Sequence, residues 1–133
     1  MVQDMAKKII SEAVALNAQD IYMIPLSENY ELYMRIGDER RFINNYDTEQ
    51  MMSLISHFKF VSGMNVGEKR RSQLGSCDYP FSDEEEISLR LSSVGDYRGR
   101  ESLVIRLLYS GRHDLKYWFN GMHNIMEAIG GRG

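Results

Sequence analysis

The sequence predicts an α+β domain in which a mostly antiparallel sheet of about six strands is flanked by helices. Three observations support this prediction. Several short segments alternate apolar and polar residues, two longer segments repeat apolar residues at helical spacing, and successive strands are joined by short connections. Parallel neighbours would need crossovers of a dozen or more residues. With 133 residues, the chain has the length of one domain.

The first part of the chain contains a helix and three strands. Apolar residues recur every three or four positions over residues 2–16, which predicts an amphipathic helix. Strands are predicted at residues 20–26 and 30–36. The second of these alternates apolar and polar residues, so one face should be buried and the other exposed to solvent. A turn at residues 37–38 then leads into a short third strand that runs through residues 42–43.

The second helix has the clearest local signals. Asp47 is predicted to cap its N-terminus, with Gln50 three residues later as in a capping box. Gly63 is predicted to end it. Three more strands are expected near residues 74–81, 85–93 and 101–109, followed by one helical turn at Asp114–Phe119 and a last helix capped by Asn120. In outline, this order of elements is PAS-like.

The composition argues against several classes of protein. A net charge of −3 argues against general binding of nucleic acid, which depends on a basic surface. The single cysteine, Cys77, excludes an internal disulfide and favours a reducing compartment, and we interpret it as a packing residue. No apolar run has the length of a membrane span, and charges interrupt the N-terminal apolar pattern as they would not in a signal peptide. The protein is therefore interpreted as cytoplasmic.

Residues with catalytic or metal-binding chemistry form no recognisable motif. None of His57, His113 and His123 pairs with another at helical ligand spacing, so we predict no metal site. The acidic run Asp83–Glu86 is interpreted as a solvated hairpin tip rather than a cation site. The phosphate-binding loop GxxxxGK[ST] does not occur. We therefore predict no self-contained catalytic site.

Arginines on the last two predicted strands are the main candidate site. The strand Leu103–Leu108 is apolar on both faces except at Arg106, which predicts a central strand covered on both sides, with Arg106 partly desolvated. Arg90 falls on the polar face of the preceding strand. A desolvated guanidinium needs an anionic partner. That partner is either one of the 19 acidic residues of the chain or a phosphate, which the guanidinium fork binds with two nitrogens. The residues alone leave both possibilities open.

Four stretches are similar to motifs of a known family. The chain resembles the N-terminal domain of the type II secretion and type IV pilus assembly ATPases, and most closely the competence (DNA-uptake pilus) ATPases of Gram-positive bacteria. The similar stretches are Ala18–Pro25, Phe60–Gly75, Ile87–Ser93 and Gly99–Leu108. The sequence departs from the family pattern at Tyr22 and Ile24, where the family has His and Glu. The roles of these two positions therefore stay open.

The resemblance implies a division of the chain and a role for its arginines. Residues 1–112 would form the N-terminal PAS-like domain, and residues 113–133 a linker and helix leading to a RecA-like ATPase domain that is missing here. The sequence is therefore expected to be a piece of a longer protein. By motif position, Arg90 and Arg106 would contact the nucleotide phosphates. Weaker candidates are Arg70 and Arg71 in the polar stretch, and Arg98 and Arg100 on the turn between the last two strands.

The resemblance also implies cofactors, partners and a location. The full-length protein would be a hexameric ATPase that uses ATP and Mg, powers pilus assembly and DNA uptake, and lies at the inner face of the cell membrane. Its partners would be its own RecA-like domain, neighbouring subunits and a membrane platform protein, without direct contact to nucleic acid. The fragment alone would contain no catalytic residue, bind neither ATP nor Mg, and be inactive.

Two other functions are compatible with the same residues. One is a free-standing PAS-like sensor that binds a small ligand in an apolar pocket. The other is an interaction domain that docks on a membrane platform protein and keeps its arginines in internal ion pairs.

Overall fold

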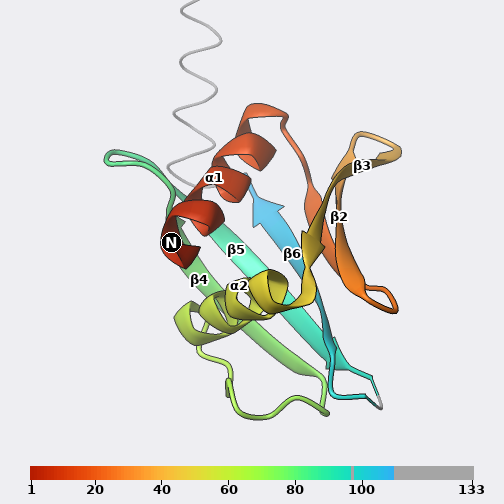
Figure 1. Ribbon diagram of the computed structural model, residues 1–133. Helices are drawn as coiled ribbons and strands as arrows, with labels where there is room; N and C mark the ends of the chain where they lie inside the picture. The colour runs from red at the N-terminus through yellow and green to blue at the C-terminus, as the bar shows by residue number, and fades with distance from the viewer. Residues whose placement is uncertain (97, 110–133) are drawn as a thin grey trace, which may run out of the picture.

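Two helices lie on one face of a six-stranded antiparallel sheet in the computed structural model, which describes residues 1–96 and 98–109 (Figure 1). The strand order is β3-β2-β1-β6-β5-β4. The predicted α+β class and the antiparallel sheet are confirmed. The turn at Asp114–Phe119, the helix from Asn120 and the division of the chain after residue 112 lie outside the described residues. The elements are α1 (Val2–Ala15), β1 (Asp20–Pro25), β2 (Asn29–Ile36), β3 (Glu39–Asp47), α2 (Thr48–Val61), β4 (Gln73–Pro80), β5 (Glu86–Gly95) and β6 (Glu101–Leu108).

The ends of α2 follow from the capping residues that the sequence predicts. The carboxylate of Asp47 accepts a hydrogen bond from the backbone N–H of Gln50 at 2.7 Å, which satisfies one donor of the first turn. The chain leaves the helix through Gly63, whose φ of 84° is readily adopted only by glycine. These local interactions fix where the helix begins and ends.

The hydrophobic core lies between the two helices and one face of the sheet. Alternate strand residues such as Met23, Leu32 and Ile105 are 0% exposed on this face. Ile10 and Leu54 bring α1 and α2 down onto them, and both are also 0% exposed. The opposite face of the sheet, which we call the open face, carries the residues between these core positions: Asp20, Tyr22, Tyr33, Arg35, Arg90, Val104 and Arg106.

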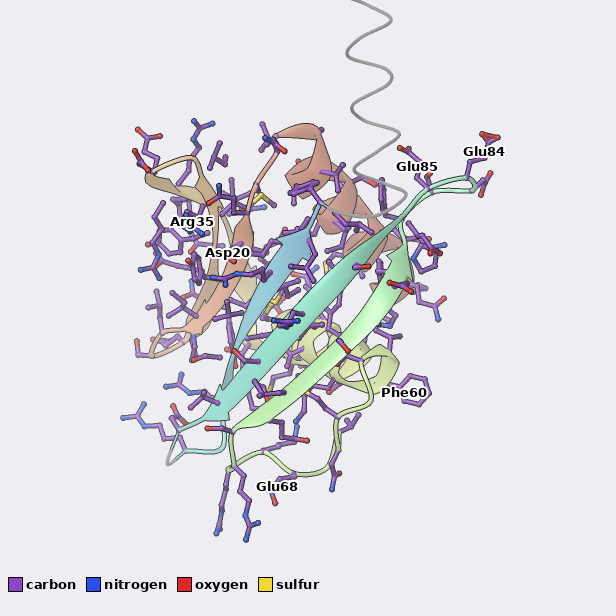
Figure 2. All side chains as sticks on the ribbon, turned by 180° about the vertical axis from the view of Figure 1, so that it is seen from behind. Asp20, Arg35, Phe60, Glu68, Glu84 and Glu85 are labelled. Atoms are coloured by element: carbon purple, nitrogen blue, oxygen red, sulfur yellow. The ribbon has the colours of Figure 1, made fainter. Side chains whose placement is uncertain are left out.

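The prediction that β6 is covered on both sides is wrong for the described part of the chain. β6 is central in the sheet, as expected, but both described helices lie on the same face (Figures 1 and 2). Val104 and Leu108 are only half-buried on the open face. Among the described residues, their neighbours on this face come from the adjacent strands and not from a second layer.

A buried ion pair fixes the loop between α2 and β4. The Nζ of Lys59 lies 2.5 Å from Oε2 of Glu101, and the lysine side chain is 0% exposed. The same ammonium donates to the backbone carbonyl of Glu68 at 2.8 Å. The loop also passes so close to the end of β5 that a Cβ added at Gly95 would overlap the carbonyl oxygen of Lys69. The basic stretch after Glu68 therefore has a fixed position beside the β5–β6 hairpin.

Candidate functional site

Four charged residues form a row across the open face of the sheet. Asp20 of β1 is the register partner of Arg35 on β2 and of Arg106 on β6, and Arg106 is the partner of Arg90 on β5. Residues directly opposite each other in antiparallel strands point to the same face and lie side by side. Figure 2 shows Asp20 and Arg35 adjacent on this face. We call these four residues the charged row.

Asp20 is held from both sides by arginines. Nε of Arg35 donates to Oδ2 at 2.9 Å, and Nε of Arg106 donates to Oδ1 at 3.0 Å. The hydroxyl of Tyr22 donates to Oδ2 at 3.3 Å. Burial raises the pKa of Asp20, but hydrogen bonds from Arg106 and Arg35 and their positive charges outweigh burial, so the pKa lies below its usual value. Asp20 is therefore a buried carboxylate that stays ionised because two guanidinium groups surround it.

Arg106 is paired inside the domain but is not buried. Its side chain is 60% exposed, whereas the side chain of Asp20 is only 2% exposed. The expected desolvation of Arg106 is therefore wrong, because no described element covers the open face. Its bond to Asp20 uses only Nε, and among residues 1–96 and 98–109 its two terminal nitrogens have no hydrogen-bond partner. Arg106 thus presents the outer edge of its guanidinium group to solvent.

Arg90 is exposed and lies directly across from Arg106. Within the described part of the chain, no hydrogen bond or ion pair involves its side chain. The structure therefore brings together the two arginines that the resemblance singled out. Two like charges at a directly opposite pair repel each other, so this position favours an anion that both can bind.

The four weaker candidates lie apart from the charged row. Arg100 is structural: its Nη1 donates to the carbonyls of Leu26 and Ser27, and its Nη2 lies 3.5 Å from Asp96. Arg98 is exposed on the same hairpin. Arg70 and Arg71 are exposed on the loop before β4, where their backbone N–H groups donate to the carboxylate of Glu68. Figure 2 shows Glu68 on this loop, at the end of the sheet where the β5–β6 hairpin also lies.

A second row on the open face is largely apolar and aromatic. Tyr22 and Tyr33 are register partners, and Phe42 and Val104 extend the row on either side. The guanidinium carbon of Arg40 lies 4.6 Å from the ring centroid of Tyr22 and 5.1 Å from that of Tyr33. This arrangement allows cation–π attraction and shields part of both rings from water. Tyr22, one of the two departures from the family pattern, thus has a contact to Arg40 and one to Asp20.

A cavity of about 310 Å³ lies on the opposite side of the sheet, beside β4. His57 and Cys77 line it, together with parts of α1 and α2. His57 is hydrogen-bonded to the hydroxyl of Tyr79 at 2.8 Å, and burial lowers the pKa of the imidazole. Burial also raises the pKa of the Cys77 thiol, which agrees with a packing role and not with a nucleophile.

The other sequence predictions concern the surface and possible metal ligands. The run Asp83–Glu86 is exposed at the turn between β4 and β5, and Figure 2 shows Glu84 and Glu85 at its tip. In the described ranges, no three His, Cys, Asp or Glu side chains are grouped closely enough to hold a metal ion. None of the helices formed by these residues has the length and apolar character needed to cross a membrane.

Sequence reasoning missed Asp20 and Arg35 as site residues. The strand alternation places Arg35 on the polar face of β2, and that signal was available. It does not reveal that β1 lies between β2 and β6, which is what brings Arg35 and Arg106 to the same carboxylate.

Comparison with known proteins identifies the family. The family described as "Type II/IV secretion system protein" matches residues 1–128. The competence protein ComGA of Streptococcus pneumoniae is 56% identical over 133 residues, which are 100% of this chain and 42% of that protein. ComGA of Bacillus subtilis is 33% identical over 80% of this chain and 30% of that protein. The type IV pilus assembly ATPase PilB of Thermus thermophilus is 31% identical over 80% of this chain and 12% of its own length.

A solved structure shows the same fold. The ATPase DotB of Legionella pneumophila matches with a TM-score of 0.54 and 13% identity, over 74% of this chain and 27% of that chain. The chain spans less than half the length of each of these relatives. The family match over residues 1–128 includes the sheet, both helices and the charged row. The chain therefore belongs to the type II/IV secretion system protein family.

Proposed function

We propose that this chain is the N-terminal, non-catalytic domain of a hexameric ATPase that powers a competence or type IV pilus, and that Arg90 and Arg106 contact the phosphates of bound ATP. The family membership and the names of the relatives support an ATPase of a competence or type IV pilus system, and the hexamer is part of the proposal. The second part rests on one observation. Arg90 and Arg106 are direct register partners on the open face, and both present guanidinium groups to solvent.

The chemistry of the pair fits a phosphate better than a neutral ligand. Guanidinium groups bind phosphate oxygens through two parallel N–H donors and stay charged at every pH that a protein meets. Two such groups side by side offset the charge that builds up on a transferring phosphoryl group. The described residues offer no third element of a catalytic site. The phosphate-binding loop, the Mg²⁺ ligands and the attacking water would therefore come from a RecA-like domain outside these residues.

The ion pair between Arg106 and Asp20 does not block this role. Asp20 occupies Nε of Arg106 and leaves both terminal nitrogens for another acceptor. The open face also gives a second domain or a neighbouring subunit direct access to both arginines, because no described helix covers it. The proposed partners also include a membrane platform protein of the pilus machinery.

The test uses the full-length ATPase with Arg90→Gln and Arg106→Gln. Each variant should form hexamers but lose ATP turnover by at least about 100-fold, the typical cost of removing one group that stabilises transition-state charge. Arg41→Gln is the matched control, because Arg41 is an exposed arginine on edge strand β3 whose one ion pair within residues 1–96 and 98–109 is with Glu39 at 3.5 Å. Its turnover should equal that of the unmodified protein. Intact hexamers of either test variant with normal turnover would refute the proposed contact.

A further inference from the structure

The charged row has a property that phosphate binding alone does not explain. One buried carboxylate, Asp20, is shared by two arginines whose surroundings differ. Only one of them, Arg106, belongs to the proposed phosphate site. We build on that proposed function and assign roles to Asp20 and Arg35.

Asp20 cannot be left without a positive partner. Its side chain is 2% exposed, and an unpaired buried carboxylate is strongly unfavourable. Any event that draws Arg106 away from Asp20 therefore requires a second cation that stays. Arg35 fills this position, because its Nε donates to Oδ2 at 2.9 Å while Arg106 donates to the other oxygen.

The two arginines are held to different degrees. The side chain of Arg35 is 35% exposed, and its Nη1 makes a second, long bond to the carbonyl of Gly37 at 3.4 Å. Arg106 is 60% exposed, and its side chain makes a single hydrogen bond to the described part of the chain, from Nε to Asp20. Tyr22 adds its hydroxyl to Oδ2, the oxygen on the Arg35 side. Release of Arg106 would thus break one hydrogen bond to Asp20 and leave those from Arg35 and Tyr22 in place.

Arg90 makes the release of Arg106 depend on an anion. It lies directly across from Arg106 and has no side-chain hydrogen bond or ion pair to any described residue. Without an anion, Asp20 lowers the repulsion between the two arginines. A phosphate bound between them offers Arg106 a second acceptor, in competition with Asp20.

We propose that Asp20 is an internal competitor that occupies Arg106 in the absence of phosphate, and that Arg35 retains Asp20 when phosphate takes Arg106. Asp20 and Arg35 are then positioning residues that set how readily Arg106 is transferred. Removing Asp20 releases Arg106 and strengthens anion binding. Removing Arg35 forces Asp20 to keep Arg106 and weakens anion binding.

The experiment titrates the 133-residue chain with inorganic tripolyphosphate near 0.15 M salt, where distant surface charges are screened. The side-chain N–H signals of the arginines are followed by NMR. In the unmodified chain, the Arg106 and Arg90 signals should shift while the Arg35 signal keeps its position. Asp20→Asn should tighten the dissociation constant about threefold to fivefold, the size expected for an ion pair with an exposed partner. Arg35→Gln should weaken it by a similar factor.

Charge-matched controls separate this mechanism from a change in net charge. Asp38→Asn alters the charge as Asp20→Asn does, and Arg41→Gln alters it as Arg35→Gln does, but both residues are exposed and outside the charged row. These controls should leave the dissociation constant within about 1.5-fold. Arg35→Lys keeps a cation beside Asp20 and should bind like the unmodified chain. Urea unfolding of every variant confirms that each is folded during the titration.

The possible results distinguish the inference from the proposed function. If tripolyphosphate leaves the Arg90 and Arg106 signals of the unmodified chain unchanged, the competition between Asp20 and phosphate for Arg106 is overturned, whereas the phosphate contact in the full-length ATPase is tested separately by the turnover of Arg90→Gln and Arg106→Gln. If it shifts them but Asp20→Asn weakens binding, Asp20 orients Arg106 rather than competing for it, and the inference is overturned. Equal dissociation constants for Asp20→Asn, Arg35→Gln and their controls would overturn it as well.

Discussion

Replacing Lys59 with methionine should strongly destabilise the domain, because the side chain of Lys59 is 0% exposed and is ion-paired with Glu101. Methionine is close in length and removes only the charge and its hydrogen bonds. The substitution leaves the carboxylate of Glu101, whose side chain is 6% exposed, without its partner at 2.5 Å. Breaking a buried ion pair from one side typically costs about 3–5 kcal/mol, because the remaining charge stays buried.

The structure adds a second, smaller contribution. The ammonium also donates to the carbonyl of Glu68 at 2.8 Å and lies 3.5 Å from that of Val66. Both carbonyls belong to the loop before β4, so Lys59→Met should also lower the protection of this loop in hydrogen exchange. For a domain of this size, urea lowers the free energy of unfolding by about 1–3 kcal/mol per molar. The unfolding midpoint should therefore fall by roughly 2 M.

The matched variant is Lys59→Met combined with Glu101→Met. Removing both charges eliminates the unpaired carboxylate, and apolar replacements of buried pairs are often close to neutral. The double variant should therefore recover most of the lost stability in urea and leave only the cost of the loop carbonyls. A double variant as unstable as Lys59→Met alone would refute the reasoning, because the loss would then not come from the uncompensated carboxylate.

Two further predictions concern packing and pH. Gly95→Ala should lower the midpoint of urea unfolding and displace the loop before β4, because the added Cβ would overlap the backbone of Lys69. Gly67→Ala is the control, because a Cβ there would lie 3.5 Å from its nearest neighbour, Oδ1 of Asn65, and it should lower the midpoint much less. Burial lowers the pKa of His57 below its ordinary 6.5, so the unfolded chain binds the proton more readily and stability should fall as pH decreases through 6.5 towards the folded pKa. His57→Gln should flatten this dependence in urea midpoints measured at about pH 7.5 and about pH 5. An unchanged pH slope in this variant would contradict the assignment.

The sequence by itself determined the fold class, most of the described elements and the family. The ends of α2 were predictable from Asp47, Gln50 and Gly63, because capping depends on residues within one turn of the chain. The faces of β2 were predictable because side chains alternate along any strand. The family was recognisable from four local motifs in order, and these motifs also singled out Arg90 and Arg106 as candidate phosphate contacts.

Only the tertiary structure decided which charges meet. Asp20 and Arg106 are 86 positions apart in the chain and become neighbours because β6 pairs with β1. The expectation of a second covering layer over β6 was wrong for the described residues, because an apolar strand pattern cannot distinguish a covering helix from flanking strands. The local sequence around Lys59 did not indicate that its side chain is buried, because its partner Glu101 lies on β6, far away in the sequence. Pairing between strands is set by the packing of the whole sheet, and a local pattern carries no information about it.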